Sequence, residues 1–371
     1  MLKKFEVENF KGFSQRLIWD LTARDYAFNR NLERNGIVNK AIIYGKNGIG
    51  KSSLGLALFD LTIHLTDKER INSAYLNNYR NLLAPEKPVS FAYTFQFDQT
   101  EIIYEYQKMD PDYLICEKLT VDGKVIIDYN YLIKQKQYVD PKVQGSLNIE
   151  LVDNKLSVIK YLYRNQVSGE NPAITEMMQF CENMLWFRSL SDGNTYAGFT
   201  NGRATLAENL YQSGKIREFE HFLQENGLQY ELEFESVNGI HELRAIFRNG
   251  DQVYKTSFES IASTGTKALY LFFNWNIIAF KKLSFLFIDE FDAFLHYESS
   301  EYVIRELNKN SRFQSVVTTH NTYLMNNKLT RPDCCFIMTE NQISSLKNAT
   351  PRELREGHNL EKLYLSGEFG E

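Results

Sequence analysis

One short segment near the start of the chain has the residue types and spacing of a phosphate-binding loop. Residues 45–52 read Gly-Lys-Asn-Gly-Ile-Gly-Lys-Ser, which fits the pattern G-x-x-x-x-G-K-[ST]. The glycines let the backbone turn so that several N–H groups point into one cavity, which suits phosphate oxygens. In such a loop Lys51 reaches the β- and γ-phosphates and the Ser52 hydroxyl binds Mg²⁺. The residues expected to contact a nucleotide here are Gly45, Asn47, Gly48, Gly50, Lys51, Ser52 and Ser53.

Two adjacent acidic residues follow an apolar run in the last third of the chain. The segment Phe285–Glu290 reads Phe-Leu-Phe-Ile-Asp-Glu, so a buried strand would end on two carboxylates. Ligands bind at the carboxyl ends of strands in open α/β sheets. Asp289 is then placed to hold Mg²⁺, directly or through water, and Glu290 to orient and deprotonate an attacking water. Without a phosphate loop in the same chain, a solvated acidic strand end would be the simpler interpretation.

Two further motifs carry weaker signals. Residues 263–267 read Ser-Thr-Gly-Thr-Lys, and small residues at a helix start can turn backbone N–H groups toward an anion. An ordinary capped helix start explains the same residues, so Ser263, Gly265 and Lys267 gain weight only from their place between the other motifs. His320 directly follows an apolar run that ends in two threonines. A lone histidine is more often structural, but at a strand end His320 could contact the γ-phosphate or the water and act with Lys51 and Glu290.

Regular elements are predicted around each of these motifs. A β-branched run at 41–44 precedes the glycine loop, and leucines recur on one face of a helix predicted at 53–65. Strand, glycine loop and helix in that order form the context that a phosphate loop requires. The last third predicts a helix at 267–280, a strand at 283–288, a helix at 298–308 and a strand at 314–318. The fold class expected is therefore α/β, a P-loop NTPase with a mixed sheet and flanking helices.

The middle of the chain has a different pattern. Aromatic residues alternate at 91–97, and the chain turns back into a second strand at 101–107. Asn249-Gly250 predicts a hairpin between strands at 244–247 and 252–257. Further segments expected are strands at 5–13, 15–21 and 228–234 and helices at 173–185 and 204–226. We expect residues 1–66 and 255–371 to form the nucleotide-binding core and residues 67–254 to form an inserted α+β lobe.

Composition limits the function classes. The formal net charge is −5, which disfavours a surface that coats nucleic acid, although a local basic patch remains compatible with it. The 4 cysteines show no metal-ligand spacing and are expected to be reduced thiols of a cytoplasmic protein. No apolar run approaches the ~20 residues that span a bilayer, and the first residues lack the apolar core of a signal peptide.

The order of the motifs resembles that of the ABC-type ATPase heads of the SMC, RecF and OLD-nuclease group. Residues 5–13 resemble the first strand of the group, and residues 288–296 resemble its acidic strand with the D-loop that follows. More narrowly, the chain is similar to small standalone AAA-family ATPases of abortive-infection and anti-phage systems, to which residues 363–367 fit loosely. The resemblance covers 1–65 and 261–329, and no motif between them matches.

The resemblance implies ATP and Mg²⁺ as ligands, ATP hydrolysis as the activity and a pair of heads as the working unit. Two heads would sandwich two ATP molecules, so that the phosphate loop, the acids and His320 of one copy act on one ATP. Ser263, Gly265 and Lys267 of the other copy would close over its γ-phosphate. Asp292 in the D-loop would communicate across the interface.

The chain also departs from the pattern of the group. Its signature reads Ser-Thr-Gly-Thr-Lys where transporters have Ser-Gly-Gly. The glutamine of the Q-loop is not assigned: Gln96 and Gln99 are candidates, although ordinary strand or turn positions explain both. Phe10, Lys11 and Phe13 could touch adenine, and a core role for the two rings fits equally well.

The sequence favours a switch. ATP binding would join the heads, hydrolysis would separate them, and a separate effector protein, a nuclease or toxin, would respond in anti-phage defence. The alternative is a RecF- or SMC-like repair ATPase that clamps DNA, which makes nucleic acid a further potential partner. A module that holds ATP without hydrolysing it is disfavoured by the paired acids. A GTPase is disfavoured because no [NT]-K-x-D motif occurs, and a transporter subunit fits poorly with the β-rich middle.

Overall fold

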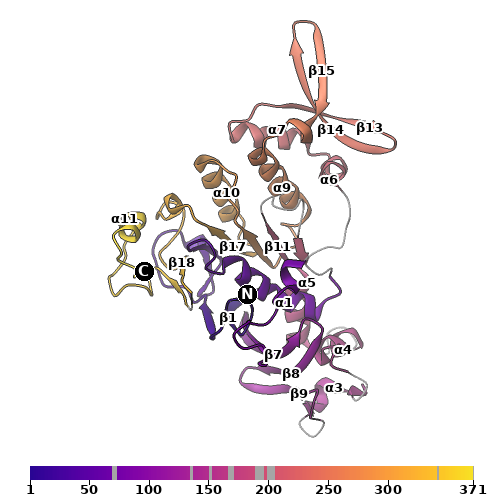
Figure 1. Ribbon diagram of the computed structural model, residues 1–371, viewed down its shortest axis with the longest axis vertical. Helices are drawn as coiled ribbons and strands as arrows, with labels where there is room; N and C mark the ends of the chain where they lie inside the picture. Colours follow the sequence, from indigo (N-terminus) through magenta and orange to yellow (C-terminus); the bar gives the residue numbers. More distant parts are fainter. Residues whose placement is uncertain are drawn as a thin grey trace.

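The computed structural model describes residues 1–68, 73–133, 137–149, 153–165, 171–188, 196–198, 205–340 and 342–370. Its strands form two large sheets, a three-stranded sheet and a two-stranded ribbon. Helices pack between and around them, so the chain has the mixed α/β fold predicted from the sequence (Figure 1).

The sheet that carries the predicted motifs has the strand order β12-β11-β16-β17-β5-β18-β19. Its strands are Tyr196–Gly198 (β12), Met184–Arg188 (β11), Phe285–Asp289 (β16), Gln314–Thr319 (β17), Lys40–Tyr44 (β5), Cys335–Met338 (β18) and Ile343–Ser345 (β19). The strands from β11 to β18 run parallel, and β12 and β19 are antiparallel edges. All residues of β5, β16 and β17 are buried, as expected for parallel strands covered on both faces.

The second large sheet is antiparallel throughout and has the order β10-β9-β8-β7-β6-β1-β2. Its strands are Gln137–Val139 (β10), Lys124–Asn130 (β9), Tyr113–Val121 (β8), Thr100–Asp110 (β7), Val89–Phe97 (β6), Leu2–Glu8 (β1) and Leu17–Asp20 (β2). Burial alternates along β6 and β7, so one face of the sheet packs inward. Phe91, Tyr93 and Phe95 supply that inner face, in agreement with the aromatic alternation in the sequence.

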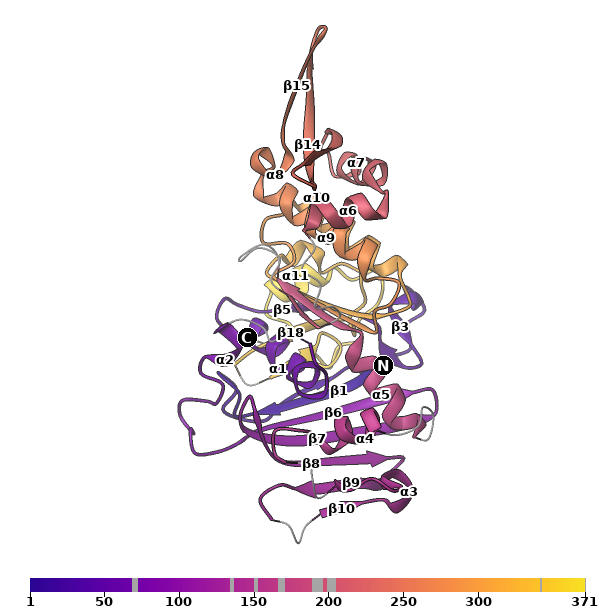
Figure 2. The ribbon, with the colours of Figure 1, turned by 90° about the vertical axis from the view of Figure 1, so that its right-hand side faces the viewer.

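Helix α1 (Lys51–Leu65) lies between the two large sheets (Figure 2). A Cβ on Gly55 would lie 2.8 Å from the ring of Phe287 on β16, so the helix touches the parallel sheet closely. On its other side the Tyr93 hydroxyl of β6 donates to the carbonyl oxygen of Ala57 at 3.1 Å. Helix α5 (Pro172–Glu182) packs on α1 and on β7 of the antiparallel sheet, and α4 (Val158–Asn165) packs on α5. Both sheets therefore hold the helix that follows the phosphate loop.

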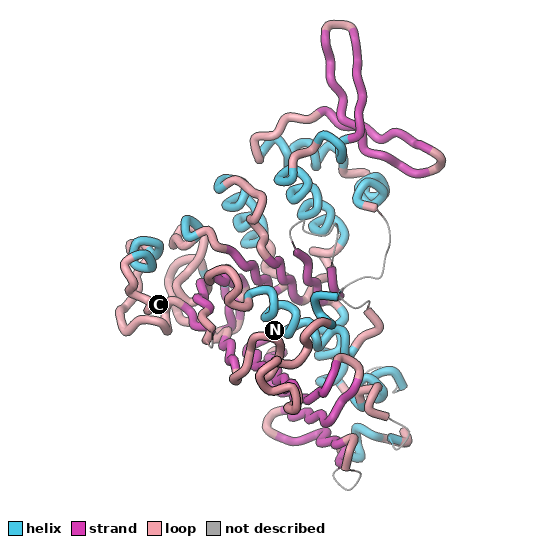
Figure 3. The backbone as a smooth tube through the Cα atoms, viewed as in Figure 1, coloured by secondary structure: helices cyan, strands magenta, loops and turns pink. Residues whose placement is uncertain are grey.

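Helices α9 (Thr264–Ile278) and α10 (Tyr297–Lys309) cover the opposite face of the parallel sheet (Figure 1). Helices α6 (Leu206–Ser213) and α7 (Ile216–Glu225) pack on α9. Beyond them the small sheet of β13 (Glu231–Val237), β14 (Ile240–Asn249) and β15 (Gln252–Ser257) projects from the molecule (Figure 3). The predicted Asn249-Gly250 hairpin is the turn of this projection. Helix α8 (Phe258–Ile261) connects β15 to α9.

Short elements complete the described chain. They are α2 (Ser73–Leu76), α3 (Pro141–Gln144), α11 (Leu360–Leu365), β3 (Glu33–Arg34), β4 (Ile37–Val38) and the 3-10 turns Arg30–Leu32 and Thr322–Leu324.

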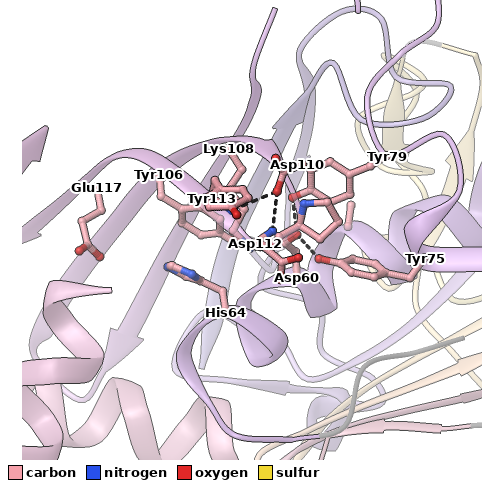
Figure 4. A network of polar contacts seen from close by, with 12 residues as sticks. Asp60, His64, Tyr75, Tyr79, Tyr106, Lys108, Asp110, Asp112, Tyr113 and Glu117 are labelled. Atoms are coloured by element: carbon pink, nitrogen blue, oxygen red, sulfur yellow. Dashed lines mark hydrogen bonds and ion pairs between the residues drawn. The ribbon is translucent and has the colours of Figure 1, made fainter. Parts of the chain in front are cut away.

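A buried polar network fastens α1 to the antiparallel sheet (Figure 4). Asp60 of α1 is fully buried and accepts four hydrogen bonds. The hydroxyls of Tyr75 and Tyr79 donate to Oδ2 at 2.7 and 2.6 Å. The Tyr106 hydroxyl and the buried Lys108 ammonium, both on β7, donate to Oδ1 at 2.8 and 2.7 Å. Because every oxygen lone pair has a donor, the charge of Asp60 is tolerated in the interior.

The expected inserted lobe of residues 67–254 is not a single unit in the structure. Its strands fall in three sheets: β6 to β10 extend the sheet begun by β1 and β2, β11 and β12 join the parallel sheet, and β13 to β15 form the projection. The expected boundaries at 66 and 254 therefore do not coincide with sheet boundaries. Pairing between distant segments, such as Phe5 with Tyr93, has no local signal in the sequence.

Two helix predictions need correction. The predicted helix at 173–185 ends at Glu182, and the apolar residues that follow form β11. A short apolar run fits a helix or a buried strand, and here pairing with β16 decides. The predicted helix at 204–226 is two helices, because Gly214 adopts φ 67° and ends α6. The strand predicted at 5–13 already ends at Glu8, where Asn9 turns the chain with φ 62°.

Candidate nucleotide site

The loop between β5 and α1 needs glycine at three positions. Gly48 and Gly50 have φ of 78° and 111°, in the region that side chains disfavour. A Cβ on Gly50 would lie 3.0 Å from the ring of Phe13, and one on Gly45 would lie 3.0 Å from the carbonyl oxygen of Met338. Backbone conformation and close packing together shape the loop that the sequence predicts.

The side chain of Lys51 lies inside this loop. Its ammonium donates to the carbonyl oxygens of Gly45 at 2.7 Å and Lys46 at 3.1 Å. Burial lowers the pKa of Lys51, and the carboxylates of Asp289, Glu290 and Asp292 oppose that change. The ammonium thus occupies a cradle of carbonyls with three carboxylates close enough to affect it. Asn47 is exposed at the tip of the loop, and Ser52 and Ser53 are half-buried in the first turn of α1.

Strand order brings the other predicted residues to the same edge of the sheet. β17 lies between β5 and β16 and is parallel to both. The ends of these strands therefore meet, and His320, directly after β17, lies with Nδ1 3.4 Å from Nζ of Lys51. Asp289 ends β16 on the far side of β17. Residues separated by more than two hundred positions in the sequence thus converge on the loop.

Asp289 has one carboxylate oxygen without a hydrogen-bond donor. Its side chain is fully buried, and Oδ1 accepts from the Thr318 hydroxyl at 2.8 Å. Among the described residues no donor bonds Oδ2, which lies 3.8 Å from Nε of Arg188. Burial raises the pKa of Asp289, while the hydroxyls of Ser52 and Thr318 and the Arg188 guanidinium oppose that rise. A buried, unpaired oxygen near a serine hydroxyl matches the hard oxygen ligands that Mg²⁺ takes, so these residues fit that ion.

Glu290 is held at both its backbone and its side chain. Its φ of 49° is unusual for a residue other than glycine, and its N–H donates to the Thr318 hydroxyl at 2.7 Å. Its Oε2 accepts from Nη2 and Nε of Arg188 at 2.6 and 3.2 Å. Residues in such backbone conformations are often found at functional sites. One threonine hydroxyl therefore links both acids of the strand end.

The segment directly after β16 contacts both β17 and the start of α9 within the same chain. Asp292 accepts from the Thr319 hydroxyl at 2.6 Å. Burial raises the pKa of Asp292, and the Thr319 bond opposes that rise. A Cβ on Gly265 would lie 2.6 Å from the carbonyl oxygen of Phe294, so this glycine packs against the backbone of the segment after β16.

Ser263 is the N-cap of α9, and its hydroxyl accepts from the N–H of Thr266 at 3.2 Å. The capped helix start considered as the simpler interpretation is thus present. Ser263 and Thr264 are nevertheless exposed, and Lys267 is half-buried. These residues can be reached from outside the chain, which the predicted role toward a second copy requires.

Among the remaining sequence candidates, Phe13 packs against Gly50 of the phosphate loop, and the others lie elsewhere. Gln96 and Gln99 sit at the turn between β6 and β7, where the Gln96 amide donates to the carbonyl oxygen of Asp98 at 3.0 Å. The rings of Phe10 and Phe13 are buried in the core. The Lys11 ammonium donates to the carbonyls of Tyr75 and Asn77, and burial lowers its pKa to about 8.

Arg188 and Thr318 lie at the site, although the sequence motifs predict no role for either. The helix predicted at 173–185 includes Met184 and Leu185, so the sequence did not indicate that Arg188 ends a strand. The available signal was the apolar run Met184-Leu185-Trp186-Phe187 followed by a charged residue, the same pattern that marked Asp289.

The family comparison matches part of the chain. Residues 179–326 match a family described as "AAA domain, putative AbiEii toxin, Type IV TA system". The match runs from the end of α5 through β11, α9, β16 and β17. No curated protein sequence matches the chain. In the described part of the chain, no helix combines the length and apolar character needed to cross a membrane.

Several solved structures have a similar outline. The Smc head domain with an extended coiled coil from Pyrococcus furiosus, bound to the C-terminal domain of ScpA, is 15% identical with a TM-score of 0.46, and the match covers 94% of this chain and 97% of that one. The SMC head domain from Thermotoga maritima is 15% identical with a TM-score of 0.42, and 93% and 99% are covered. The recombination mediator RecF with ATP is 12% identical with a TM-score of 0.39, and 93% and 99% are covered.

All three TM-scores lie below 0.5, so these likenesses decide no function. The family match is the stronger finding, because it spans the segment that holds the signature, both acids and His320. The chain is therefore similar to an AAA domain of that family over residues 179–326, and its phosphate loop at 45–52 lies before the matched segment.

Proposed function

We propose that this protein binds and hydrolyses ATP and uses that cycle as a switch. The proposal rests on the convergence of the predicted site residues at the carboxyl ends of neighbouring parallel strands. The phosphate loop after β5, His320 after β17 and the acids at the end of β16 lie together, with Lys51 Nζ 3.4 Å from His320. The buried unpaired oxygen of Asp289 provides a place for the cation that accompanies ATP.

The proposed roles follow from what each side chain can do. Lys51 exchanges the carbonyls of Gly45 and Lys46 for β- and γ-phosphate oxygens. Ser52 and Asp289 would hold Mg²⁺, and the ion would supply positive charge to the phosphate oxygens. Glu290 accepts a proton from the water that attacks the γ-phosphorus, and the bond to ADP breaks.

We propose further that a second copy closes the site. Ser263 and Thr264 are exposed at the start of α9, and the helix start favours an anion. Ser263, Gly265 and Lys267 of one copy would face the γ-phosphate held by the other, and Asp292 would lie near the joint. Such a pair would be closed while ATP is bound and would open after ATP is hydrolysed.

The biological setting that we propose is defence. The description of the matched family refers to a toxin of a toxin–antitoxin system. The switch would then control a separate effector, a nuclease or a toxin, that a head pair can hold inactive or release.

Phosphate release by the Lys51→Ala variant tests the enzymatic part of the proposal. We expect the rate in Mg²⁺ and ATP to fall about 10²–10³-fold, because one positively charged donor to the transferring phosphate is lost. The exposed Lys282→Ala variant should keep the wild-type rate. Equal phosphate release by wild type and Lys51→Ala would mean that the chain does not hydrolyse ATP at this loop.

A second function, a clamp on DNA, is favoured by one surface feature. A groove of about 400 Å³ lies where α9 and α10 end. This is the side of the parallel sheet where β16 and β17 begin, opposite to the strand ends that carry the acids and His320. Its described cationic lining residues are Lys215, Lys281, Lys309 and Arg312, and Glu306, which pairs with Lys309, is acidic. In a chain of net charge −5 this is a local basic surface that suits phosphates.

Salt dependence separates this function from the first. If the groove binds duplex DNA, the slope of log K against log salt should be about −3 to −4, since about four cations would each replace a counterion. The double variant Lys281→Ala and Arg312→Ala should make this slope less negative by about two units, one for each cation removed. The matched double variant Lys87→Ala and Lys328→Ala should leave it unchanged. Binding that is absent or insensitive to these groove substitutions would remove the clamp from consideration.

A further inference from the structure

Arg188 occupies a place at the site that none of the sequence motifs marks. It is the last residue of β11, and the strand register pairs it with Asp289 on β16. Its side chain therefore emerges at the same sheet edge as both acids. It is 35% exposed, so part of the guanidinium is shielded while part faces the space above the strand ends.

The contacts of this guanidinium are directional. Nη2 and Nε both donate to the same oxygen of Glu290, Oε2, at 2.6 and 3.2 Å. Nε lies 3.8 Å from Oδ2 of Asp289, beyond hydrogen-bond distance but close enough for attraction. Two donors hold Oε2 at the arginine, and neither of these two bonds uses the other oxygen, Oε1.

The backbone of Glu290 is fixed independently. Its φ of 49° and the bond from its N–H to Thr318 hold the main chain. A glutamate side chain that is not held rotates about three bonds and samples many orientations in which its carboxylate cannot reach the attacking water. With both ends of the residue held, those rotations are suppressed.

We propose that Arg188 is a positioning residue: it grips Oε2 of Glu290 so that Oε1 is presented to the attacking water. The inference rests on the proposed role of Glu290 as the base. Arginine suits this task because its planar fork offers two N–H groups at fixed geometry, which a lysine ammonium cannot reproduce. Arg188 acts through Glu290 and does not bind ATP.

An ordinary surface ion pair is the competing explanation. Exposed pairs between a helix or strand end and a neighbour contribute little and have no catalytic consequence. The two explanations differ in what they predict for turnover, since only a positioning role links the arginine to the rate of the chemical step.

The test is the steady-state kinetics of Arg188→Ala, Arg188→Gln and Arg188→Lys with Mg²⁺ and ATP. We expect kcat of Arg188→Ala and Arg188→Gln to fall roughly 10–100-fold, the size of effect that a displaced catalytic group produces. KM for ATP should change by less than about threefold, because ground-state binding is retained. Arg188→Lys should recover part of kcat. The matched control is Arg305→Ala, which removes an exposed arginine paired with Glu301 and should leave kcat unchanged.

The decisive step is a double-mutant cycle with Glu290→Gln. If Arg188 works through Glu290, adding Arg188→Ala to Glu290→Gln should lower turnover no further. An equal additional loss in that background, or a rise in KM with unchanged kcat, would mean that Arg188 contacts ATP itself and would overturn the inference.

Failure of this inference is distinguishable from failure of the proposed function. If Glu290→Gln hydrolyses ATP like wild type, the assignment of the base is wrong. If Glu290→Gln is impaired but all three Arg188 variants stay within about twofold of wild type, only the positioning role is wrong. Thermal unfolding of each variant shows whether it is folded, and Arg188→Lys keeps the charge should Arg188→Ala fail to fold.

Discussion

The Glu290→Gln variant should hydrolyse ATP about 10²–10⁴-fold more slowly than wild type while still binding it. The amide keeps the shape of the side chain and can still accept from Arg188 at one oxygen, but it cannot take a proton from water. The phosphate loop, Lys51 and the Asp289 oxygen are untouched, so the affinity for ATP should remain within a few-fold. Single-turnover phosphate release and equilibrium binding of ATP measure the two quantities separately.

The control for this variant is Glu298→Gln, which changes an exposed acid at the start of α10. It should retain the wild-type rate within about twofold, because surface substitutions away from the site have small effects. If Glu290→Gln and Glu298→Gln release phosphate equally fast, another group removes the proton and the assignment of Glu290 fails.

The Asp60→Ala variant should lose about 3–5 kcal/mol of the free energy of unfolding. Asp60 accepts from three tyrosine hydroxyls and from Lys108, whose side chain is 1% exposed. Removing the carboxylate takes the negative charge away from the buried lysine ammonium and one shared acceptor away from the three hydroxyls. Urea unfolding followed by circular dichroism gives the loss directly.

Two control variants separate the effect of the buried charges from that of an ordinary surface pair. The double variant Asp60→Asn with Lys108→Met removes both charges, keeps an oxygen for the tyrosines and should recover most of the stability. Glu231→Ala breaks an exposed pair with Arg248 and should leave the free energy of unfolding close to that of the wild type. An Asp60→Ala chain that is as stable as Glu231→Ala would show that the network contributes little to the fold.

The network also ties the fold to the site. Asp60 lies on α1, the helix that begins with Lys51 and follows the phosphate loop. Its partners on β7 and in 75–79 anchor that helix to the antiparallel sheet. Loss of Asp60 should therefore loosen the loop as well as the fold, and ATP affinity should fall before global unfolding.

Much of the site was predictable because the phosphate loop, the two acids and His320 each lie at or directly after the end of a strand. The apolar runs before Gly45, Asp289 and His320 are buried strands, and parallel strands in one sheet place their ends at one edge. The sequence alone therefore led to residues that the structure brings together. Their roles in binding and catalysis stay predictions.

What could not be predicted depends on contacts between distant segments. The run before Arg188 fits a helix or a strand, and only its partner β16 decides between them. Asp60 has no local feature that marks it as buried, because its partners come from residues 75–108. The division of residues 67–254 among three sheets could not be predicted for the same reason, since β6 pairs with β1 across more than eighty residues.

The most direct test of the central claim is the molar mass of Glu290→Gln in solution with Mg²⁺ and ATP. The chain has a mass of 43.3 kDa, and we expect twice that value with ATP and the single value without it. In the same background Ser263→Arg should bind ATP but remain at the single mass, because Ser263 is exposed at the surface proposed to meet the second copy. A single mass with ATP fully bound, or a pair that forms equally well with Ser263→Arg, would contradict the closed two-copy site.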